Sequence, residues 1–240
     1  MSRRTSPYID ALSQHPTRRH QRVRDLIARG VDVNDPGAYH IPPLTYAAAV
    51  SGVDDDQVME MLIAAGADVC ADSGDEGTAL TTAAANGNFK QVAVLLRHGA
   101  DQRDRALQAT VFGDHEPHGA AQVVMLLLDA GAGLDTRTSG WTPLMWAVHS
   151  GYPNCVRVLI DRGADVRAVD GEGKSVRAIA QRCRTDDARQ DVLALVLPAI
   201  AAADRQDLQA AADGDPTSQP TSLTAVAGPI TTTAAPRRRM

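Results

Sequence analysis

The segment His115–His118 (His-Glu-Pro-His) contains the residue types that could bind a metal ion. Imidazole and carboxylate groups are ordinary zinc ligands, but zinc needs three or four of them converging on one point. Pro117 and the surrounding loop composition give no helical face that would make these ligands converge. A metal-dependent enzyme at His115 and His118 would require stoichiometric bound metal. We expect a solvated turn and no metal site instead.

The segment Gly171–Ser175 (Gly-Glu-Gly-Lys-Ser) resembles the end of a nucleotide phosphate-binding loop. Such a loop needs an earlier glycine and a preceding apolar strand, and this segment has neither. The sequence also lacks a serine-nucleophile elbow, a zinc-protease motif and a paired-carboxylate constellation. We therefore expect no cofactor and no enzymatic activity.

Charge and cysteine usage exclude several other classes. The 240 residues carry a net charge of −5, so no global positive field attracts nucleic acid. Two short arginine clusters, at residues 3–4 and 237–239, are expected to be solvated. The three cysteines lie far apart, which is typical of a reducing compartment and not of a disulfide scaffold.

The longest apolar stretch, Val192–Ala203, is interrupted by Pro198 and is too short to span a bilayer. The N-terminal residues have no apolar run of the kind that a secretory signal requires. We expect a cytoplasmic, monomeric protein that binds neither nucleic acid nor membranes.

The chain contains an internal repeat of 32 to 36 residues, and the segments discussed above lie within it. Five phrases similar to Leu-Ile-Ala-Ala-Gly-Ala-Asp recur, each with apolar residues seven, four and three positions before its glycine. This spacing predicts one buried stripe on an amphipathic helix. The glycine is expected to end that helix in the left-handed conformation. The five glycines are Gly30, Gly66, Gly99, Gly131 and Gly163.

A second phrase recurs in every unit after the first, upstream of the amphipathic helix. In Trp141–Ala147 (Trp-Thr-Pro-Leu-Met-Trp-Ala), Thr142 is the expected N-cap and Pro143 the first helical residue. The alanine that ends each copy would let two helices approach closely, and in the copy at residues 104–109 it is Ala109. Weaker copies occur at residues 42–47, 78–83, 104–109 and 175–180.

These two phrases, in constant register, resemble the ankyrin repeat, a unit of about 33 residues with a T-P-L-H-x-A motif, a β-turn and two helices. The resemblance covers about residues 5–200 and is closest to small free-standing ankyrin proteins of bacterial type. It implies an all-α solenoid of about six helix-turn-helix units with β-turn fingers. The motif's histidine is missing from every copy, where Thr45, Thr81, Leu107, Met145 and Ala178 stand instead.

The resemblance divides the chain into four parts. Residues 1–34 are expected to be a degenerate N-terminal capping repeat that clearly keeps only its second helix, and residues 35–174 the central repeats. Residues 175–212 are expected to be a C-terminal capping repeat followed by a short helix, and residues 213–240, rich in Thr, Ser, Pro and Ala, a disordered tail. Four arginines of the first repeat should face solvent: Arg18, Arg19, Arg22 and Arg24.

Two inner turns carry insertions, Val53–Gln57 and Asp114–Ala120. Insertions in repeat proteins fall in loops and sometimes contribute to binding. Drift without function is the commoner origin, and it is the one expected here.

The resemblance implies binding of a partner protein through the concave surface formed by finger tips and the exposed sides of the first helices. Phe112 and Trp141 are the strongest candidates there, because exposed aromatic residues are favoured as interface hot spots. Partial burial against a neighbouring finger is the alternative. Tyr46 and Trp146 are expected in the core. The other expected surface positions are Ile41, Asp75, Glu76, Asn86 and His149.

Two protein-binding functions remain open at this point. One is a scaffold or adaptor that uses this surface for several partners. The other is a dedicated inhibitor, immunity or chaperone subunit for a single enzyme or toxin. The fold does not encode the partner's identity, since the exposed residues of ankyrin repeats vary while the helical framework stays the same.

Overall fold

The computed structural model describes residues 6–50, 55–74, 77–112, 116–184 and 186–212. Residues 1–200 form one compact unit, and residues 201–240 form a second. The predicted tail at 213–240 lies outside the described residues. Of the second unit, the structure describes the last part of one helix.

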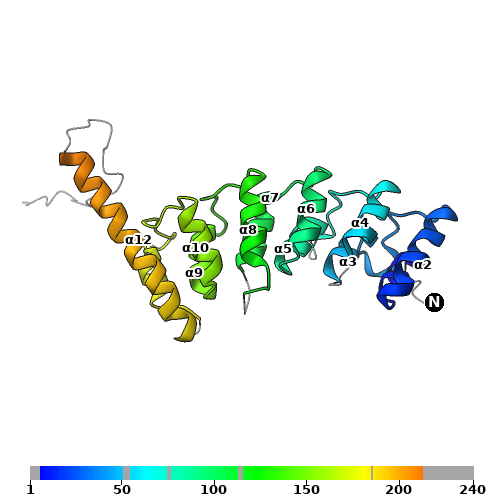
Figure 1. Cartoon of the computed structure of the whole chain (residues 1–240), viewed down its shortest axis with the longest axis horizontal. Coiled ribbons are helices and arrows are strands. Elements are labelled where there is room, and N and C mark those ends of the chain that lie inside the picture. Colours follow the sequence, from blue (N-terminus) through cyan, green and yellow to red (C-terminus); the bar gives the residue numbers. More distant parts are fainter. Residues whose placement is uncertain (1–5, 51–54, 75–76, 113–115, 185, 213–240) are drawn as a thin grey trace, which may run out of the picture. The chain divides into compact units, whose positions relative to one another are not determined.

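The first unit is built from consecutive pairs of helices, here numbered as repeats one to six (Figure 1). A short 3-10 helix (Gly37–Tyr39) precedes repeat two. The final helix begins in the first unit and ends in the second. The pairs are α1 (Pro7–Leu12) with α2 (Pro16–Ala28), α3 (Pro43–Ala49) with α4 (Asp55–Ala64), α5 (Ala79–Ala85) with α6 (Phe89–Arg97), α7 (Arg103–Val111) with α8 (Ala120–Asp129), α9 (Pro143–Ser150) with α10 (Pro153–Asp161), and α11 (Val176–Ala180) with α12 (Asp186–Ala212).

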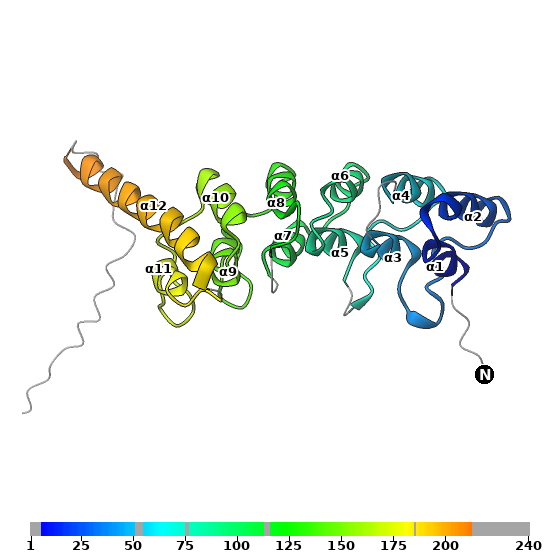
Figure 2. The same ribbon diagram turned by 60° about the horizontal axis from the view of Figure 1, so that its bottom comes forward.

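Within this unit the helices form two rows. Each first helix packs on the first helix of the next repeat, from α1 to α11, and the second helices from α2 to α10 do the same. Figure 2 shows the row of α3, α5, α7 and α9 beneath the row of α4, α6, α8 and α10. The all-α solenoid of about six units is therefore confirmed, over the residues that the structure describes.

Hairpin-like fingers precede three of the first helices. Isolated antiparallel β-bridges join Asp72 to Thr78, Thr138 to Trp141 and Val169 to Ser175. These bridges confirm the predicted β-turn fingers in repeats three, five and six.

The repeated glycines end the second helices as predicted. Gly66 has φ 93°, its N–H donates to the Ile63 carbonyl at 2.9 Å, and the next N–H donates to the Leu62 carbonyl at 3.0 Å. This double hydrogen bond is the Schellman arrangement, which uses a left-handed residue to satisfy the last carbonyls of a helix. The other four glycines of the series show the same arrangement, with φ from 69° to 92°.

The predicted N-caps are also present. The Thr142 hydroxyl accepts a hydrogen bond from the Met145 N–H at 3.3 Å. In repeat three, Thr78 and Thr81 form a reciprocal capping box, in which Thr81 Oγ1 accepts from the Thr78 N–H at 2.9 Å. Thr81 occupies the position of the family's histidine, so a threonine ties down the base of the finger in that repeat.

The first repeat has both helices, so the prediction of a single clear helix was wrong. Tyr8 and Leu12 of α1 are fully buried, and the Tyr8 hydroxyl donates to the Val31 carbonyl at 3.0 Å. Arg19 is also buried, against expectation, because it lies four residues before Val23 on the inward stripe of α2. The other three arginines are exposed as predicted.

The last helix also differs from the prediction. Val192 and Val196 are buried, but α12 continues through Pro198 to Ala212 as one helix and not as two. Proline removes the hydrogen bond to the carbonyl four residues earlier, here at Ala194. Because Ala194 and Pro198 are both exposed, water can hydrate that carbonyl and the helix continues.

No helix among the described residues combines the length and the uninterrupted apolar character that crossing a bilayer would require.

Candidate functional site

Four aromatic side chains meet on the first-helix row, and we call Phe112, Trp141, Trp146 and His149 the aromatic cluster. The ring of Trp146 lies at its centre, 4.7 Å from the Trp141 ring and 5.1 Å from the Phe112 ring, between centroids. His149 lies 5.2 Å from Trp141 in an edge-to-face arrangement. Such geometries are favourable for aromatic pairs.

Local structure places each of these rings. Trp146 and His149 are three residues apart on α9, opposite the buried Leu144, Ala147 and Val148. Trp141 is fixed by two hydrogen bonds of 3.0 Å with Thr138 across the repeat-five finger.

Phe112 caps the C-terminus of α7 in an extended conformation, and its side chain is 64% exposed. Trp141, Trp146 and His149 are half-buried. The cluster is therefore packed internally and still presents apolar surface to solvent. A surface of this kind is costly to leave in water and marks candidate interaction sites.

A cavity of about 330 Å³ adjoins the cluster between repeats five and six. We call it the repeat-six cavity, and its lining combines aromatic, aliphatic and basic side chains. The Arg184 N–H donates to the His149 carbonyl at 3.1 Å, which ties the loop after α11 to the end of α9. The cavity is lined by Trp141, His149, Lys174, Ala178, Ile179, Gln181 and Arg182.

The electrostatics of His149 follow from this position. Its partial desolvation lowers the pKa of the imidazole, and the nearby Arg184 cation lowers this pKa further. His149 is therefore neutral at neutral pH, and it contributes a ring face and one hydrogen-bond donor.

The finger of repeat six is held by a buried carboxylate. Asp170 Oδ1 accepts from the Glu172 N–H at 2.9 Å and from the Lys174 N–H at 2.8 Å. On the surface of this finger, the Lys174 ammonium pairs with Glu172. Hydrogen bonds to Asp170 thus fix the backbone that carries Lys174 to the cavity, and the Lys174 side chain is paired only at the surface, with Glu172.

Repeat four has no finger, because α7 begins directly after Gln102, which has φ 55°. Asp104, in the first turn of α7, replaces the finger's contacts by accepting from the Gly133 N–H at 2.7 Å and the Thr136 hydroxyl at 3.2 Å. The helix register differs from the prediction as a result: Thr110 is buried and Ala109 only half-buried.

Arg105 of the same helix crosses toward repeat three. It lies 3.2 Å from Asp72 Oδ2 and 3.4 Å from the Gly74 carbonyl. The Gly74 N–H lowers the pKa of Asp72, helped by Gln102 and Arg105. Asp72 thus remains ionised and anchors Arg105 where the missing finger would have been.

The structure brings together three of the predicted surface residues, Phe112, Trp141 and His149. Ile41 is half-buried before α3, and Asn86 is exposed at the C-cap of α5, so both belong to other repeats. Asp75 and Glu76 lie outside the described residues.

The prediction of Trp146 and Tyr46 as core residues was wrong, since both are half-buried. The Tyr46 hydroxyl lies 2.8 Å from Ser13 Oγ, at the surface between repeats one and two. Trp146 is the residue that sequence reasoning missed in the cluster. Its spacing from His149 was the available signal, because residues three apart share a helix face.

The histidine-containing inner turn has a structural contact that the sequence did not reveal. Glu116 Oε1 accepts from the Cys155 N–H at 3.0 Å, and Oε2 accepts from the Asn154 amide at 3.1 Å. Glu116 therefore caps the N-terminus of α10 from the preceding repeat. His115 is outside the described residues, and no group of three metal-ligating side chains gathers elsewhere in the described part of the chain.

Burial raises the pKa of the Cys155 thiol, and Glu116 raises it further. Because the thiolate is the nucleophile, this cysteine is chemically inert.

Comparisons with known proteins agree with this architecture. A family profile described as "Ankyrin repeats (3 copies)" matches residues 106–170, which include the whole aromatic cluster. The ankyrin repeat domain of Bcl-3, described as a member of the IkappaB protein family, is similar in structure with a TM-score of 0.62. That match has 22% sequence identity and covers 82% of this chain and 86% of the other.

Two curated relatives match parts of the sequence. The human Ankyrin repeat and KH domain-containing protein 1 is 53% identical over 51 residues, which is 21% of this chain and 2% of the relative. The mouse Protein phosphatase 1 regulatory subunit 27 is 34% identical over 90 residues, which is 36% of this chain and 58% of the relative. The chain thus spans less than two thirds of either relative's length. The repeats and paired helices thus have the ankyrin-repeat architecture, and residues 106–170 match the profile of that family.

Proposed function

We propose that this protein binds a partner protein through its finger and first-helix face, with the aromatic cluster as the centre of the contact. Ankyrin repeats are general protein–protein interaction modules, and extended surfaces of this kind are what repeat proteins use for binding. The aromatic cluster supports a specific location on that surface.

The observation that carries this proposal is the exposure of Phe112. Phe112 is 64% exposed, although its ring lies against Trp146 within the cluster. Burying the rest of an aromatic side chain in an interface is favourable by about 25 cal/mol per Å². Tryptophan beside it is among the residue types most enriched at binding hot spots.

The pattern of packing distinguishes the cluster from scattered surface residues. Single exposed apolar side chains are normal and need no explanation. Four rings drawn from α7, α9 and the finger before α9 form a contiguous and pre-ordered surface instead. A pre-ordered surface loses little side-chain entropy when a partner docks.

A second candidate function is a regulatory subunit for one enzyme. The observation that favours it is the match to a protein named as a regulatory subunit of a phosphatase, of which the chain covers 58%. A dedicated regulator would bind one client tightly and change that client's activity. A scaffold would bind several partners without changing their catalysis.

Affinity capture from a lysate of the source organism tests the proposal. We compare the wild type with a Phe112→Asp/Trp141→Asp variant whose fold is checked by circular dichroism. A Phe89→Asp/Met125→Asp variant is the matched control, because these two side chains are exposed apolar residues of the second-helix row. One stoichiometric partner, lost only in the cluster variant, is the expected result.

A partner that the cluster variant retains would contradict the proposed site. Activity assays on a captured enzyme then separate the two candidate functions. Altered catalysis favours the regulatory subunit, and unaltered catalysis with several captured proteins favours the scaffold.

A further inference from the structure

The repeat-six cavity combines an apolar wall with positive charge, and this inference from it rests on the proposed function. We propose that the cavity binds a segment of the partner protein in which a large apolar side chain lies within two residues of an aspartate or glutamate. The apolar side chain packs on Trp141, and the carboxylate binds Lys174 and Arg182.

The wall of the cavity supplies the apolar contact. Trp141 and His149 form one side, edge-to-face at 5.2 Å, and Ile179 is buried behind them. A volume of about 330 Å³ lies at the lower end of the range for small-molecule sites, about 300–1,000 Å³. It has room for one or two side chains of an extended segment.

The charge of this region is opposite to that of the whole chain. Residues 170–184 contain four basic side chains and two acidic ones, whereas the chain carries a net charge of −5. Two of the basic side chains, Lys174 and Arg182, line the cavity itself. Arg184 adds positive potential at its edge, close enough to act on His149.

The acidic residues of the region do not cancel this charge at the cavity. Asp170 is buried and accepts two backbone N–H groups within its own finger. Glu172 pairs with Lys174, but its side chain is 74% exposed. Such exposed pairs contribute little, so a carboxylate of the partner can replace Glu172. At the start of α12, Asp186 pairs with Arg189, 2.7 Å away on the same helix.

A carboxylate is the group that these two cations recognise best. The Arg182 guanidinium offers a planar fork that matches the two carboxylate oxygens, and Lys174 offers a point charge beside it. The chain's own C-terminal sequence is a poor occupant, because Arg237–Arg239 would meet charge of the same sign. Complementarity therefore favours an acidic and apolar segment from another protein.

Selection from a displayed library of random 12-residue peptides tests this inference on the full chain. Enriched sequences should carry Asp or Glu within two residues of Leu, Ile, Phe or Trp. The selected peptides are then synthesised with both ends blocked, and their binding is measured by fluorescence polarisation. Replacing the acid by its amide should weaken binding about tenfold or more, as expected for a hydrogen bond to a charged group.

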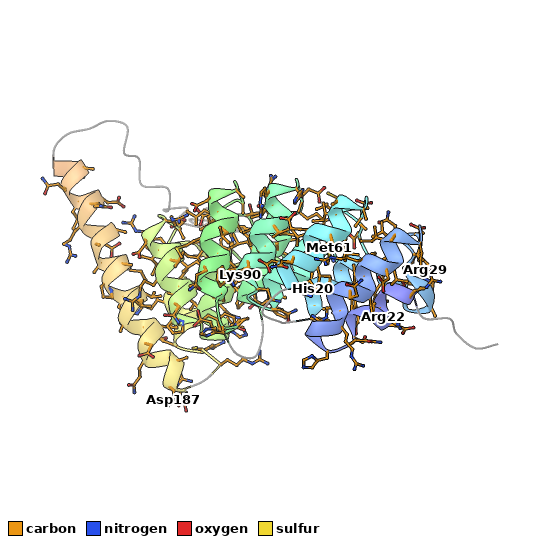
Figure 3. All side chains as sticks on the ribbon, turned by 45° about the vertical axis from the view of Figure 1, so that its right-hand side comes forward. His20, Arg22, Arg29, Met61, Lys90 and Asp187 are labelled. Atoms are coloured by element: carbon orange, nitrogen blue, oxygen red, sulfur yellow. The ribbon has the colours of Figure 1, made fainter. Side chains whose placement is uncertain are left out.

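Charge reversal of the cavity provides a second test of the inference. A Lys174→Glu/Arg182→Glu variant should lose these peptides and select basic and apolar sequences instead. An Arg22→Glu/Arg29→Glu variant is the matched control, since both residues are exposed in repeat one, Arg22 on α2 and Arg29 at its C-cap (Figure 3). It makes the same charge change and should bind the acidic peptides as the wild type does.

Several results would overturn the inference. One is a library selection that enriches no sequence, or only sequences without acidic residues. Another is a charge-reversed variant that binds the acidic peptides as tightly as the wild type, or a control variant that loses as much affinity as the charge-reversed one. Self-association of the wild type that charge reversal abolishes would also overturn it, because the occupant would then be a second copy.

The outcomes separate this inference from the proposed function. Peptides whose affinity falls when Phe112 and Trp141 are replaced, but not when Lys174 and Arg182 are replaced, would refute only the recognition of an acidic residue. A natural partner retained by the Phe112→Asp/Trp141→Asp variant would refute the proposed site itself.

Discussion

Repeats three and five share the caps and terminal glycines of one frame, and they differ at the positions that form the aromatic cluster in repeat five. Thr78 and Thr142 cap their first helices, and Gly99 and Gly163 end their second helices with φ of 85° and 87°. These pairs are each separated by 64 residues. The residues in the register of the aromatic cluster are Gly77, Thr82 and Ala85 in repeat three, and Trp141, Trp146 and His149 in repeat five.

The difference separates residues that specify the fold from residues that specify binding. The caps, glycines and buried leucines are of the same type in both repeats because each repeat must bury the same face of its helices against its neighbours. The exposed side is free to vary, and in repeat five it carries three of the four rings of the aromatic cluster. Function should therefore follow these three half-buried positions, and stability should follow the frame.

The largest expected effect is the loss of stability when a buried leucine of the frame is replaced, in either repeat. Leu80→Ala and Leu144→Ala each remove a fully buried side chain, and each should lower the free energy of unfolding by about 2–5 kcal/mol. Urea unfolding followed by circular dichroism measures both. A large difference between the two would contradict the claim that the frames are equivalent.

The next effect concerns the terminal glycines. A Cβ at Gly99 or Gly163 would meet no atom within 4 Å, so the cost of Gly→Ala comes only from the left-handed backbone. We expect each variant to lose about 1 kcal/mol of stability. Thermal unfolding of both variants checks this, and a neutral or stabilising result would show that the backbone can relax.

A smaller effect is expected when repeat five is converted toward repeat three. Trp146→Thr/His149→Ala replaces two half-buried side chains by those of the corresponding positions. Because neither ring is in the core, stability should fall by roughly 1 kcal/mol, less than for Leu144→Ala. If unfolding in urea shows a core-like loss, the cluster is a packing element and not a binding surface.

The smallest effect is the pH dependence that His149 gives to repeat five. The pKa of His149 is lowered in the folded state from about 6.5, so the unfolded chain takes up the proton first as the pH falls. The wild type should therefore lose stability as the pH drops below about 6.5. The His149→Gln variant should lose less over the same range.

Urea midpoints at pH 7.5 and 5.5 measure this difference, and the six other histidines cancel in the comparison. Parallel behaviour of wild type and variant would show that His149 is not desolvated as the structure implies.

Local features of the fold could be predicted from the sequence. The terminal glycines and the cap at Thr142 depend on residues within one turn of each helix, so their spacing was sufficient. The register of α7 could not be predicted in the same way. It depends on Asp104 bonding Gly133 and Thr136 of the next repeat, a contact that no local pattern encodes.

The candidate site was only partly predictable. Phe112, Trp141 and His149 were expected at the surface, and their mutual contact through Trp146 was not. Trp146 precedes the close-packing Ala147, so helical periodicity alone placed it near the core. The capping of α10 by Glu116 was missed for a different reason, since the two segments are 39 residues apart.

The most direct test of the central claim is the affinity of the captured partner for the wild type and for the Trp146→Thr/His149→Ala variant, measured by isothermal titration calorimetry. The account predicts that the variant unfolds within roughly 1 kcal/mol of the wild type and binds at least about 30-fold more weakly, as loss of a hot spot implies. Equal affinity in a folded variant would contradict the account and place the binding surface elsewhere on the stack.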